Sequence, residues 1–342
     1  MLLLSPPGSY GGLLAQQGFR WIEFPLSRGV NPLSELATLL RVIGLYLRER
    51  PDIAHHFTIK CVLYGGIAAR CSRAKAIVSS VTGLGHIFIT NSWRNRALRP
   101  LLALAYRFVF GRSQVIFQNP DDLEDFRRLG LIGKARSHLI RGSGVDTARF
   151  VPAARSKKGG PLKVLMVGRL LLEKGVREFV DAARLVRTKL PDTSFSLAGG
   201  ADPNNPSSID ERVIAEWKRK GDVSFLGHTE EVRDLLQAAD LVVLPSYREG
   251  APLSLIEAAA CGLPLVATDV PGCREVVLHK VNGLLVPPKN SQLLSEAIVE
   301  LLLDPERRRA MGGESRKLAC EVFAQDRVIR ETMDVYSDAL AR

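Results

Sequence analysis

Two glutamates lie eight residues apart in an otherwise apolar stretch, "PSYREGAPLSLIEAAACGLPLVAT" (residues 245–268). A strand pattern, "LVVLP", ends at Pro245, and a helix is predicted to begin near Pro252, because proline is favoured at the first helical position. Glu249 then lies in the connecting loop, whereas Glu257 lies one to two turns into a helix that is apolar on nearly every side. A buried carboxylate is costly unless something bonds it. Glu257 is therefore predicted to bind a ligand, and the vicinal hydroxyls of a ribose suit its two oxygens.

The start of this helix supports two interpretations. In one, Ser254 and Glu257 form an S-x-x-E capping box, and the glutamate only satisfies backbone at the helix start. In the other, free backbone N–H groups of the first turn bind the outer phosphate of a diphosphate, and Glu249 faces the group that this phosphate carries. The segment expected to make these contacts consists of Gly250, Ala251, Pro252, Leu253 and Ser254.

A second loop supplies positive charge. The strand pattern "LKVLMVG" ends at Gly168, which lets the backbone turn sharply, and Arg169 and Lys174 follow on the loop that leads into the next helix. Two cations beside a helix amino end suit a diphosphate, because charge-assisted hydrogen bonds add to the helix dipole. By themselves, the two cations are equally consistent with ordinary solvated loop charges.

Short β-rich runs alternate with helical periodicity along the chain. Strand patterns occur at 52–57, 76–81 and 113–119, and after "PAARSKKGGP" (152–161) the alternation restarts with strands at 162–168, 194–200, 223–227 and 241–245. This alternation predicts an α/β fold with parallel sheets flanked by helices. A chain of 342 residues suits two such domains. We expect them at 1–155 and 156–325, with 326–342 forming a C-terminal helix that packs back toward the first domain.

The positive charge of the chain is confined to its first half. Residues 1–155 hold 21 Lys and Arg against 9 Asp and Glu, and no acidic residue lies between Asp52 and Asp121. The segment "SWRNRALRPLLALAYRFVFGR" (92–112) mixes aromatic residues with five arginines. This composition suits a helix lying on an anionic membrane surface. The alternatives are a core helix with a solvated arginine face and nucleic-acid binding, and the latter is disfavoured because no RNA- or DNA-reading motif accompanies the charge.

Composition also argues against several classes of site. The five cysteines are scattered without a C-x-x-C pair, which disfavours a disulfide framework and a zinc cage and indicates a reducing compartment. His55 and His56 are adjacent on a predicted strand and point to opposite faces, so they cannot bind one metal ion. No apolar run is long enough to cross a bilayer, and the start "MLLLSPPGSYGG" reads as a strand rather than a secretory signal.

These motifs together resemble a known family. "GRLLLEKG" (168–175), "SYREGAPLSLIEAAACGLPLVAT" (246–268) and "VPGCREVV" (270–277) with "NGLLVPP" (282–288) are similar to the donor half of retaining glycosyltransferases of family 4. That family has the GT-B fold, in which two Rossmann-like domains face a central cleft. The first half, in "FPLSRGVNPL", "PDIAHHFTIKCVLYG", "VTGLGHIF" and "GSGVD", resembles a branch that builds bacterial surface polysaccharides and lipid-linked glycans.

The resemblance implies a role for each motif residue. Arg169 and Lys174 would bind the diphosphate of a nucleotide sugar and neutralise the leaving group, Glu257 would hold the ribose, and Glu249 would contact the donor sugar near the reacting carbon. Domain 1–155 would then be the acceptor side and domain 156–325 the nucleotide-sugar side. The nucleotide sugar is a co-substrate, and no cofactor and no metal site are expected, because basic side chains and helix N–H groups take over the metal's electrostatic role.

The sequence departs from the family in two places. Many relatives carry a histidine in a T-x-H-G motif where Thr82 stands here, so Thr82, Gly83 and the nearby His86 form a possible site on the first domain. Relatives also open with a strand, a glycine-rich loop and a helix before the strand that "MLLLSPPG" matches. The first domain is therefore expected to lack its initial β-α unit.

The resemblance implies a cytoplasmic glycosyltransferase, peripheral on the inner face of the plasma membrane. It would transfer a sugar from a nucleotide diphosphate sugar, expected to be a UDP-sugar, to a glycan or a polyprenyl-diphosphate-linked acceptor with retention of configuration. The basic first half suits a charged acceptor in an anionic membrane, with no nucleic acid involved. Two alternatives are a nucleotide-sugar 2-epimerase of the same fold, which needs acid and base groups, and a catalytically silent UDP or nucleotide-sugar binding protein.

Overall fold

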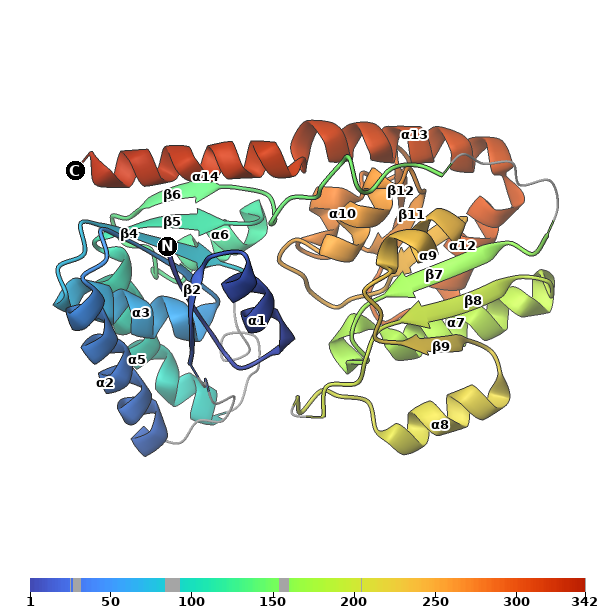
Figure 1. Ribbon diagram of the computed structural model, residues 1–342. Coiled ribbons are helices and arrows are strands. Elements are labelled where there is room, and N and C mark those ends of the chain that lie inside the picture. The colour runs from blue at the N-terminus through green and yellow to red at the C-terminus, as the bar shows by residue number, and fades with distance from the viewer. Residues whose placement is uncertain (25, 27–31, 84–92, 154–159, 204, 342) are drawn as a thin grey trace.

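Two lobes lie side by side in the computed structural model, each with a parallel β-sheet and flanking helices (Figure 1). The structure describes residues 1–24, 26, 32–83, 93–153, 160–203 and 205–341. We call the part formed by residues before about 145 the first lobe, and the part built on the later sheet the second lobe. The predicted α/β fold with two Rossmann-like units is confirmed.

The first lobe is organised around a four-stranded parallel sheet in the order β3-β4-β5-β6. Every residue of β4 and β5 is buried, as expected for strands that are covered on both faces. A separate two-stranded parallel sheet pairs β1 with β2. The strands are β1 (Leu2–Ser5), β2 (Arg20–Glu23), β3 (Ile53–Phe57), β4 (Ala76–Val81), β5 (Ser113–Phe117) and β6 (Arg136–Leu139). The helices are α1 (Ser9–Gln16), α2 (Pro32–Glu49), α3 (Ile59–Cys71), α5 (Trp93–Phe110) and α6 (Pro120–Arg128).

The second lobe has a six-stranded parallel sheet in the order β12-β11-β10-β7-β8-β9. Its strands are β7 (Lys163–Val167), β8 (Ser194–Ala198), β9 (Ser224–Gly227), β10 (Leu241–Leu244), β11 (Leu265–Thr268) and β12 (Gly283–Val286). Its helical elements are the 3-10 turn η1 (Leu172–Lys174), α7 (Val176–Lys189), α8 (Glu211–Lys220), α9 (Val232–Ala238), α10 (Leu253–Ala260), α11 (Cys273–Val276), α12 (Ser291–Leu303) and α13 (Pro305–Val322).

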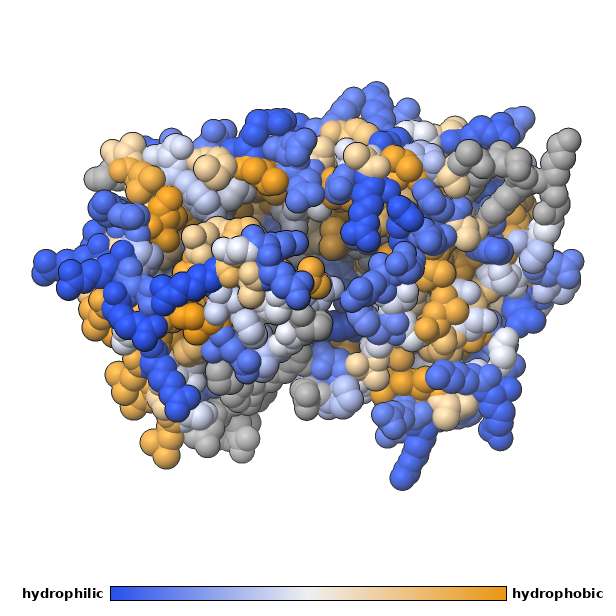
Figure 2. Space-filling view, in the orientation of Figure 1, coloured by the Kyte–Doolittle hydropathy of each residue, from blue (hydrophilic) through white to orange (hydrophobic). Residues whose placement is uncertain are grey.

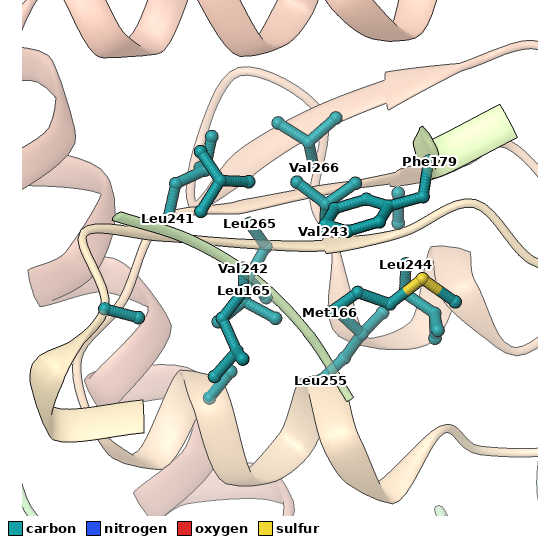
Figure 3. Packing of buried hydrophobic residues seen from close by; sticks show 14 of the residues in the cluster. Leu165, Met166, Phe179, Leu241, Val242, Val243, Leu244, Leu255, Leu265 and Val266 are labelled. Atoms are coloured by element: carbon teal, nitrogen blue, oxygen red, sulfur yellow. The ribbon is translucent and has the colours of Figure 1, made fainter. Parts of the chain in front are cut away.

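The strand order of the second lobe reverses between β7 and β10. From β7 the chain winds outward through β8 to β9, and from β10 it winds the other way through β11 to β12. Because such crossovers are right-handed, α7 and α10 cover opposite faces of the sheet. Their side chains meet the apolar strands between them, as Figure 3 shows for Phe179 of α7 and Leu255 of α10 beside Met166 and Val243. Ligands of such sheets bind at the carboxyl ends of the strands where the order reverses.

The chain passes between the lobes twice. The two crossing segments pair with each other, since Val145 N–H donates to Phe323 O at 2.8 Å and Gln325 N–H donates to Val145 O at 3.0 Å. The last helix, α14 (Gln325–Leu340), then packs along β4 and β5 of the first lobe (Figure 1). Its Tyr336 hydroxyl lies 2.6 Å from His55 Nδ1.

The two adjacent histidines of β3 face different neighbours. His55 contacts Tyr336 and Ser80, whereas the buried His56 lies 2.9 Å from the Tyr46 hydroxyl of α2. Burial lowers the pKa of His55 to about 4 and that of His56 to about 3. Both side chains are therefore neutral packing elements at physiological pH.

Within the arginine-rich segment 92–112, residues Trp93–Phe110 form α5, one side of which belongs to the core. Tyr106, Val109 and Phe110 are buried among apolar neighbours of the first lobe, as the core-helix interpretation requires. The outer face carries exposed leucines as well as the exposed Arg107, since Leu101 and Leu104 are about two-thirds exposed. Helical periodicity places these leucines on the side opposite the core residues.

Candidate functional site at the sheet switch point

Two loops leave the sheet of the second lobe side by side, at the point where its strand order reverses. Residues 168–175 follow β7, and residues 245–252, which we call the donor loop, follow the neighbouring strand β10. Tyr247 N–H donates to Glu173 O at 2.8 Å and so ties the loops together. Gly175 makes this approach possible: its φ is +71°, and a Cβ there would lie 2.1 Å from Pro245 O.

The closest pair of predicted residues is Lys174 and Glu249. Lys174 Nζ donates to Glu249 Oε1 at 2.6 Å, and the two side chains are only 22% and 11% exposed. This ion pair joins η1 to the donor loop across residues that are 75 positions apart. The structure therefore brings together one predicted phosphate-binding cation and one predicted sugar-contacting carboxylate.

Arg169 lies apart from this pair. Its guanidinium donates to Asp202 Oδ2 at 2.8 Å, beyond the end of β8, and the Arg169 side chain is about half exposed. Gly168 connects β7 to Arg169 and donates its N–H to Ala198 O at 2.9 Å. Both predicted cations thus carry a carboxylate partner, and the Lys174 ammonium keeps further N–H donors for a diphosphate.

The start of α10 is an uncapped helix terminus. Its N-cap residue is Pro252, and no side chain caps it, so the alternative interpretation of Ser254 and Glu257 as a capping box is wrong. In the described part of the chain, four backbone N–H groups here donate no hydrogen bond: those of Gly250, Ala251, Leu253 and Ser254. Free N–H groups at the positive end of a helix form an anion-binding site.

Glu257 lies within α10 and is largely buried without a hydrogen-bonding partner among the described residues. Burial raises the pKa of its carboxyl group to about 7, and the positive charge of Arg149 opposes this shift in part. An unpaired, partly desolvated carboxyl group is costly to the fold. Its retention beside the free N–H groups of a helix start is typical of a ligand contact.

The first lobe reaches the same loop. Thr82 and Gly83 follow β4, and a Cβ built on Gly250 would lie 2.5 Å from Thr82 O, so the donor loop packs directly on this turn. His86, the third residue of the site predicted on the first domain, lies outside the described residues.

Sequence reasoning missed the side chains that join the two lobes here. Asn119 Nδ2 donates to Gly250 O at 2.8 Å, and Arg248 forms ion pairs with Asp122 and Asp125 of α6. The sequence does contain a signal for part of this arrangement, because "NPDD" after a strand is typical of a capped helix start. No sequence signal pairs that helix with Arg248.

Comparison with known proteins gives matches along most of the chain. The family described as "Glycosyl transferases group 1" matches residues 149–318, and the family described as "Glycosyl transferase 4-like" matches residues 2–119.

Curated proteins that match over most of the chain include two glycosyltransferases. The N,N'-diacetylbacillosaminyl-diphospho-undecaprenol alpha-1,3-N-acetylgalactosaminyltransferase of Campylobacter jejuni is 30% identical, over 90% of this chain and 83% of that protein. The UDP-Gal:alpha-D-GlcNAc-diphosphoundecaprenol alpha-1,3-galactosyltransferase of Escherichia coli is 24% identical, over 92% of this chain and 82% of that protein.

Two solved structures have the same fold. HepE of Anabaena in complex with UDP aligns with a TM-score of 0.80 at 22% identity, over 98% of this chain and 92% of that one. The sucrose-phosphate synthase of Thermosynechococcus elongatus aligns with a TM-score of 0.77 at 23% identity, over 95% of this chain and 84% of that one.

Proposed function

This chain belongs to the group 1 glycosyltransferases, and from that premise we propose that it transfers a sugar from a UDP-sugar to a glycan or polyprenyl-diphosphate-linked acceptor, with retention of configuration. The single observation that supports the donor site most directly is the Lys174–Glu249 pair, 2.6 Å long, beside the uncapped start of α10. Cation, carboxylate and free N–H groups converge where the strand order reverses.

The site suits a nucleoside diphosphate in three parts. Lys174 and the N–H groups at the start of α10 would bind the phosphates, with Arg169 released from Asp202. Glu257 would accept hydrogen bonds from the ribose hydroxyls, which offsets the cost of its burial. Uridine is the proposed nucleoside because the related Escherichia coli enzyme is named for UDP-Gal and the HepE structure contains UDP.

The reaction develops negative charge on the departing diphosphate, and the site has to stabilise that charge. We propose that Lys174, Arg169 and the dipole of α10 do so without a divalent metal ion, because preorganised donors stabilise developing charge most strongly in a site that excludes water. Glu249, held between Lys174 and the donor loop, would contact the transferred sugar. Retention is supported by the two related enzymes, both of which are named for α-1,3 linkages.

A transfer assay tests this function. The purified protein would be incubated with a panel of UDP-sugars and synthetic polyprenyl-diphosphate-linked glycans, with product linkage determined by NMR and UDP binding measured by calorimetry. Transfer with an α-linkage is the expected result. UDP binding without transfer from any donor would favour a silent binding protein, conversion of the donor without acceptor would favour an epimerase, and absence of UDP binding would overturn the donor site.

The proposed acceptor places the enzyme at the cytoplasmic face of the plasma membrane, and the first lobe offers a surface for it. Leucines are exposed along α2 (Leu33, Leu36, Leu40 and Leu47) and along α5 (Leu98, Leu101 and Leu104). Both helices pack against α3 and so lie on one side of the lobe. Figure 2 shows part of this apolar surface at the lower left, where α2 lies. Within the described residues, no helix has both the length and the apolarity that a membrane crossing requires.

Exposed arginines accompany the leucines, among them Arg41 and Arg48 of α2 and Arg107 of α5. Apolar side chains that insert among lipids, flanked by cations, favour an anionic membrane surface. We propose that this side of the first lobe holds the enzyme on anionic lipid near its acceptor.

Replacing both Leu101 and Leu104 with glutamate is expected to reduce binding to anionic vesicles several-fold, because the change removes inserted apolar area and adds like charge to the lipid surface. Vesicle co-sedimentation at low salt and at about 0.5 M salt measures the effect, and binding should weaken at high salt. Leu303→Glu on α12 is the matched control, since Leu303 and Leu101 are each 65% exposed. Equal loss in the control, or none in the double variant, would contradict this membrane surface.

A further inference from the structure

The amino end of α6 in the first lobe meets the donor loop of the second through buried polar groups. Asn119 and Asp122 are both 0% exposed. Asn119 Nδ2 donates to Gly250 O at 2.8 Å, and the Arg248 guanidinium donates to Asp125 at 2.9 Å and to Asp122. These contacts span more than 120 residues of sequence.

The Asp122 carboxylate is held in place by contacts within the first lobe, independently of Arg248. Asn119 caps α6 by accepting the Asp122 N–H at 2.7 Å, and its amide donates to Asp122 Oδ2 at 2.9 Å. One carboxylate oxygen of Asp122 is thereby fixed by the cap, and the other is presented to Arg248. The orientation of the receiving carboxylate is therefore set by the helix start.

A buried ion pair contributes little net stability, because desolvation of both charges offsets their attraction. Such a pair instead fixes the relative positions of the two side chains, and the pair of Arg248 and Asp122 does so next to the proposed reaction centre. Arg248 reaches into the first lobe while the next residue, Glu249, turns the other way and accepts from Lys174 of the second lobe. Displacing Arg248 would therefore displace the backbone that carries Glu249.

Other restraints on the donor loop come from the second lobe. Tyr247 N–H donates to Glu173 O at 2.8 Å and Glu249 N–H donates to Pro271 O at 3.2 Å. Gly272, with φ +79°, passes so close that a Cβ would lie 2.5 Å from Glu249 O. The Arg248 and Gly250 contacts are the part of this framework that the first lobe supplies.

We infer that Arg248 is a positioning residue: through Asp122 and Asp125 it lets the first lobe hold Glu249 against Lys174, so that the donor site is correctly arranged only while the lobes are together. The inference rests on the proposed function, because it assigns Glu249 to the reaction. It couples the acceptor-side lobe to the geometry of the donor-side carboxylate.

A second ion pair between the two lobes offers a control for the Arg248 variants. Arg141 of the first lobe pairs with Glu275 of α11 at 2.7 Å, an inter-lobe ion pair in which neither partner belongs to the donor loop. Arg141→Gln removes an inter-lobe charge of the same kind, whereas Arg248→Gln removes the one attached to the loop. Any general weakening of the lobe contact would appear in both variants.

Arg248→Gln and Asp122→Asn are each expected to lower kcat for sugar transfer about ten-fold, with the dissociation constant for UDP changed by less than about three-fold. The double variant should be no slower than either single variant, because both remove one interaction. Arg141→Gln should stay within about two-fold of the unmodified protein. Thermal unfolding by circular dichroism identifies variants that fail to fold, and Arg248→Lys gives a milder change at the same position.

A second readout does not depend on transfer. Loss of the Glu249 partner exposes the Lys174 amine, so acylation of Lys174 by a limiting amount of anhydride, followed by mass spectrometry, should rise several-fold in Arg248→Gln and stay unchanged in Arg141→Gln. Unchanged kcat and unchanged Lys174 labelling in folded Arg248→Gln protein would overturn the inference. Absence of transfer by the unmodified protein would instead defeat the proposed function, while the labelling result would still report on the loop.

Discussion

Replacing Glu249 with alanine is expected to lower the rate of sugar transfer about a hundred-fold or more, while leaving the affinity for UDP within a few-fold of the original value. The reason is the position of this carboxylate, which pairs with Lys174 at 2.6 Å and lies on the loop ahead of the start of α10, the proposed phosphate site. A group that contacts the transferred sugar acts mainly on the transition state and little on the nucleotide. Loss of the carboxylate also frees Lys174 for phosphate, which opposes any loss of UDP affinity.

Steady-state kinetics and calorimetric titration of UDP measure the two effects separately. Glu249→Gln keeps the shape of the side chain and removes its charge, so a comparable loss there would assign the effect to charge. Glu314→Ala provides the control, because Glu314 is an exposed acid on α13. A loss of UDP affinity as large as the loss of rate would remove Glu249 from the sugar side of the site.

Part of the second lobe could be predicted because central strands such as β10 and β11 are buried on both faces. Such strands are nearly continuous apolar runs, and the pattern "LVVLP" at 241–245 corresponds to β10 (Leu241–Leu244). The helix expected near Pro252 begins at Leu253, with Pro252 as its N-cap. Local rules succeed here because apolar periodicity and proline chemistry are properties of neighbouring residues.

The contacts of the site could not be predicted by the same rules. Sequence spacing does not show that β7 and β10 are neighbours, and that adjacency is what brings Lys174 to Glu249. The pairing of Arg169 with Asp202 was also invisible, because it depends on where the chain turns after β8. Pairing across the lobes, as between Arg248 and Asp122, is harder still to predict, because it also depends on how the two lobes pack together.

The outer face of α5 illustrates a different limit. Counting five arginines in 92–112 suggested a basic exposed face, yet the exposed side chains include Leu101 and Leu104. Composition gives the number of charges and not their direction, which is fixed by the residues that the core takes inward, here Tyr106, Val109 and Phe110.

Replacing Glu257 with glutamine is expected to weaken UDP binding about ten- to a hundred-fold, the range for losing charge-assisted hydrogen bonds to a ligand. The same change should stabilise the ligand-free protein at pH 8, because it removes a poorly solvated carboxylate. The expected gain is about 1–2 kcal/mol, since partial exposure of Glu257 makes it smaller than the full pKa shift would give. Opposite signs for binding and stability are typical of a residue kept for its ligand. Calorimetry and thermal unfolding on the same two proteins measure both.

The pH dependence of stability and of UDP affinity distinguishes a ligand-binding role of Glu257 from a packing role. Burial raises the pKa of Glu257 from 4.5 to about 7, so the folded protein holds this proton more tightly than the unfolded chain does. The stability that protonation provides is fully present below pH 4.5 and is lost as the pH rises through 7, and Glu257→Gln should not show this loss. Ribose hydroxyls donate hydrogen bonds to the ionised form of Glu257, so UDP affinity should rise about ten-fold between about pH 6 and 8. This rise is measured relative to Glu257→Gln, because the pH dependence of UDP binding to that variant reports ionisation of the nucleotide alone. A parallel pH dependence in both proteins would mean that Glu257 does not meet the ribose.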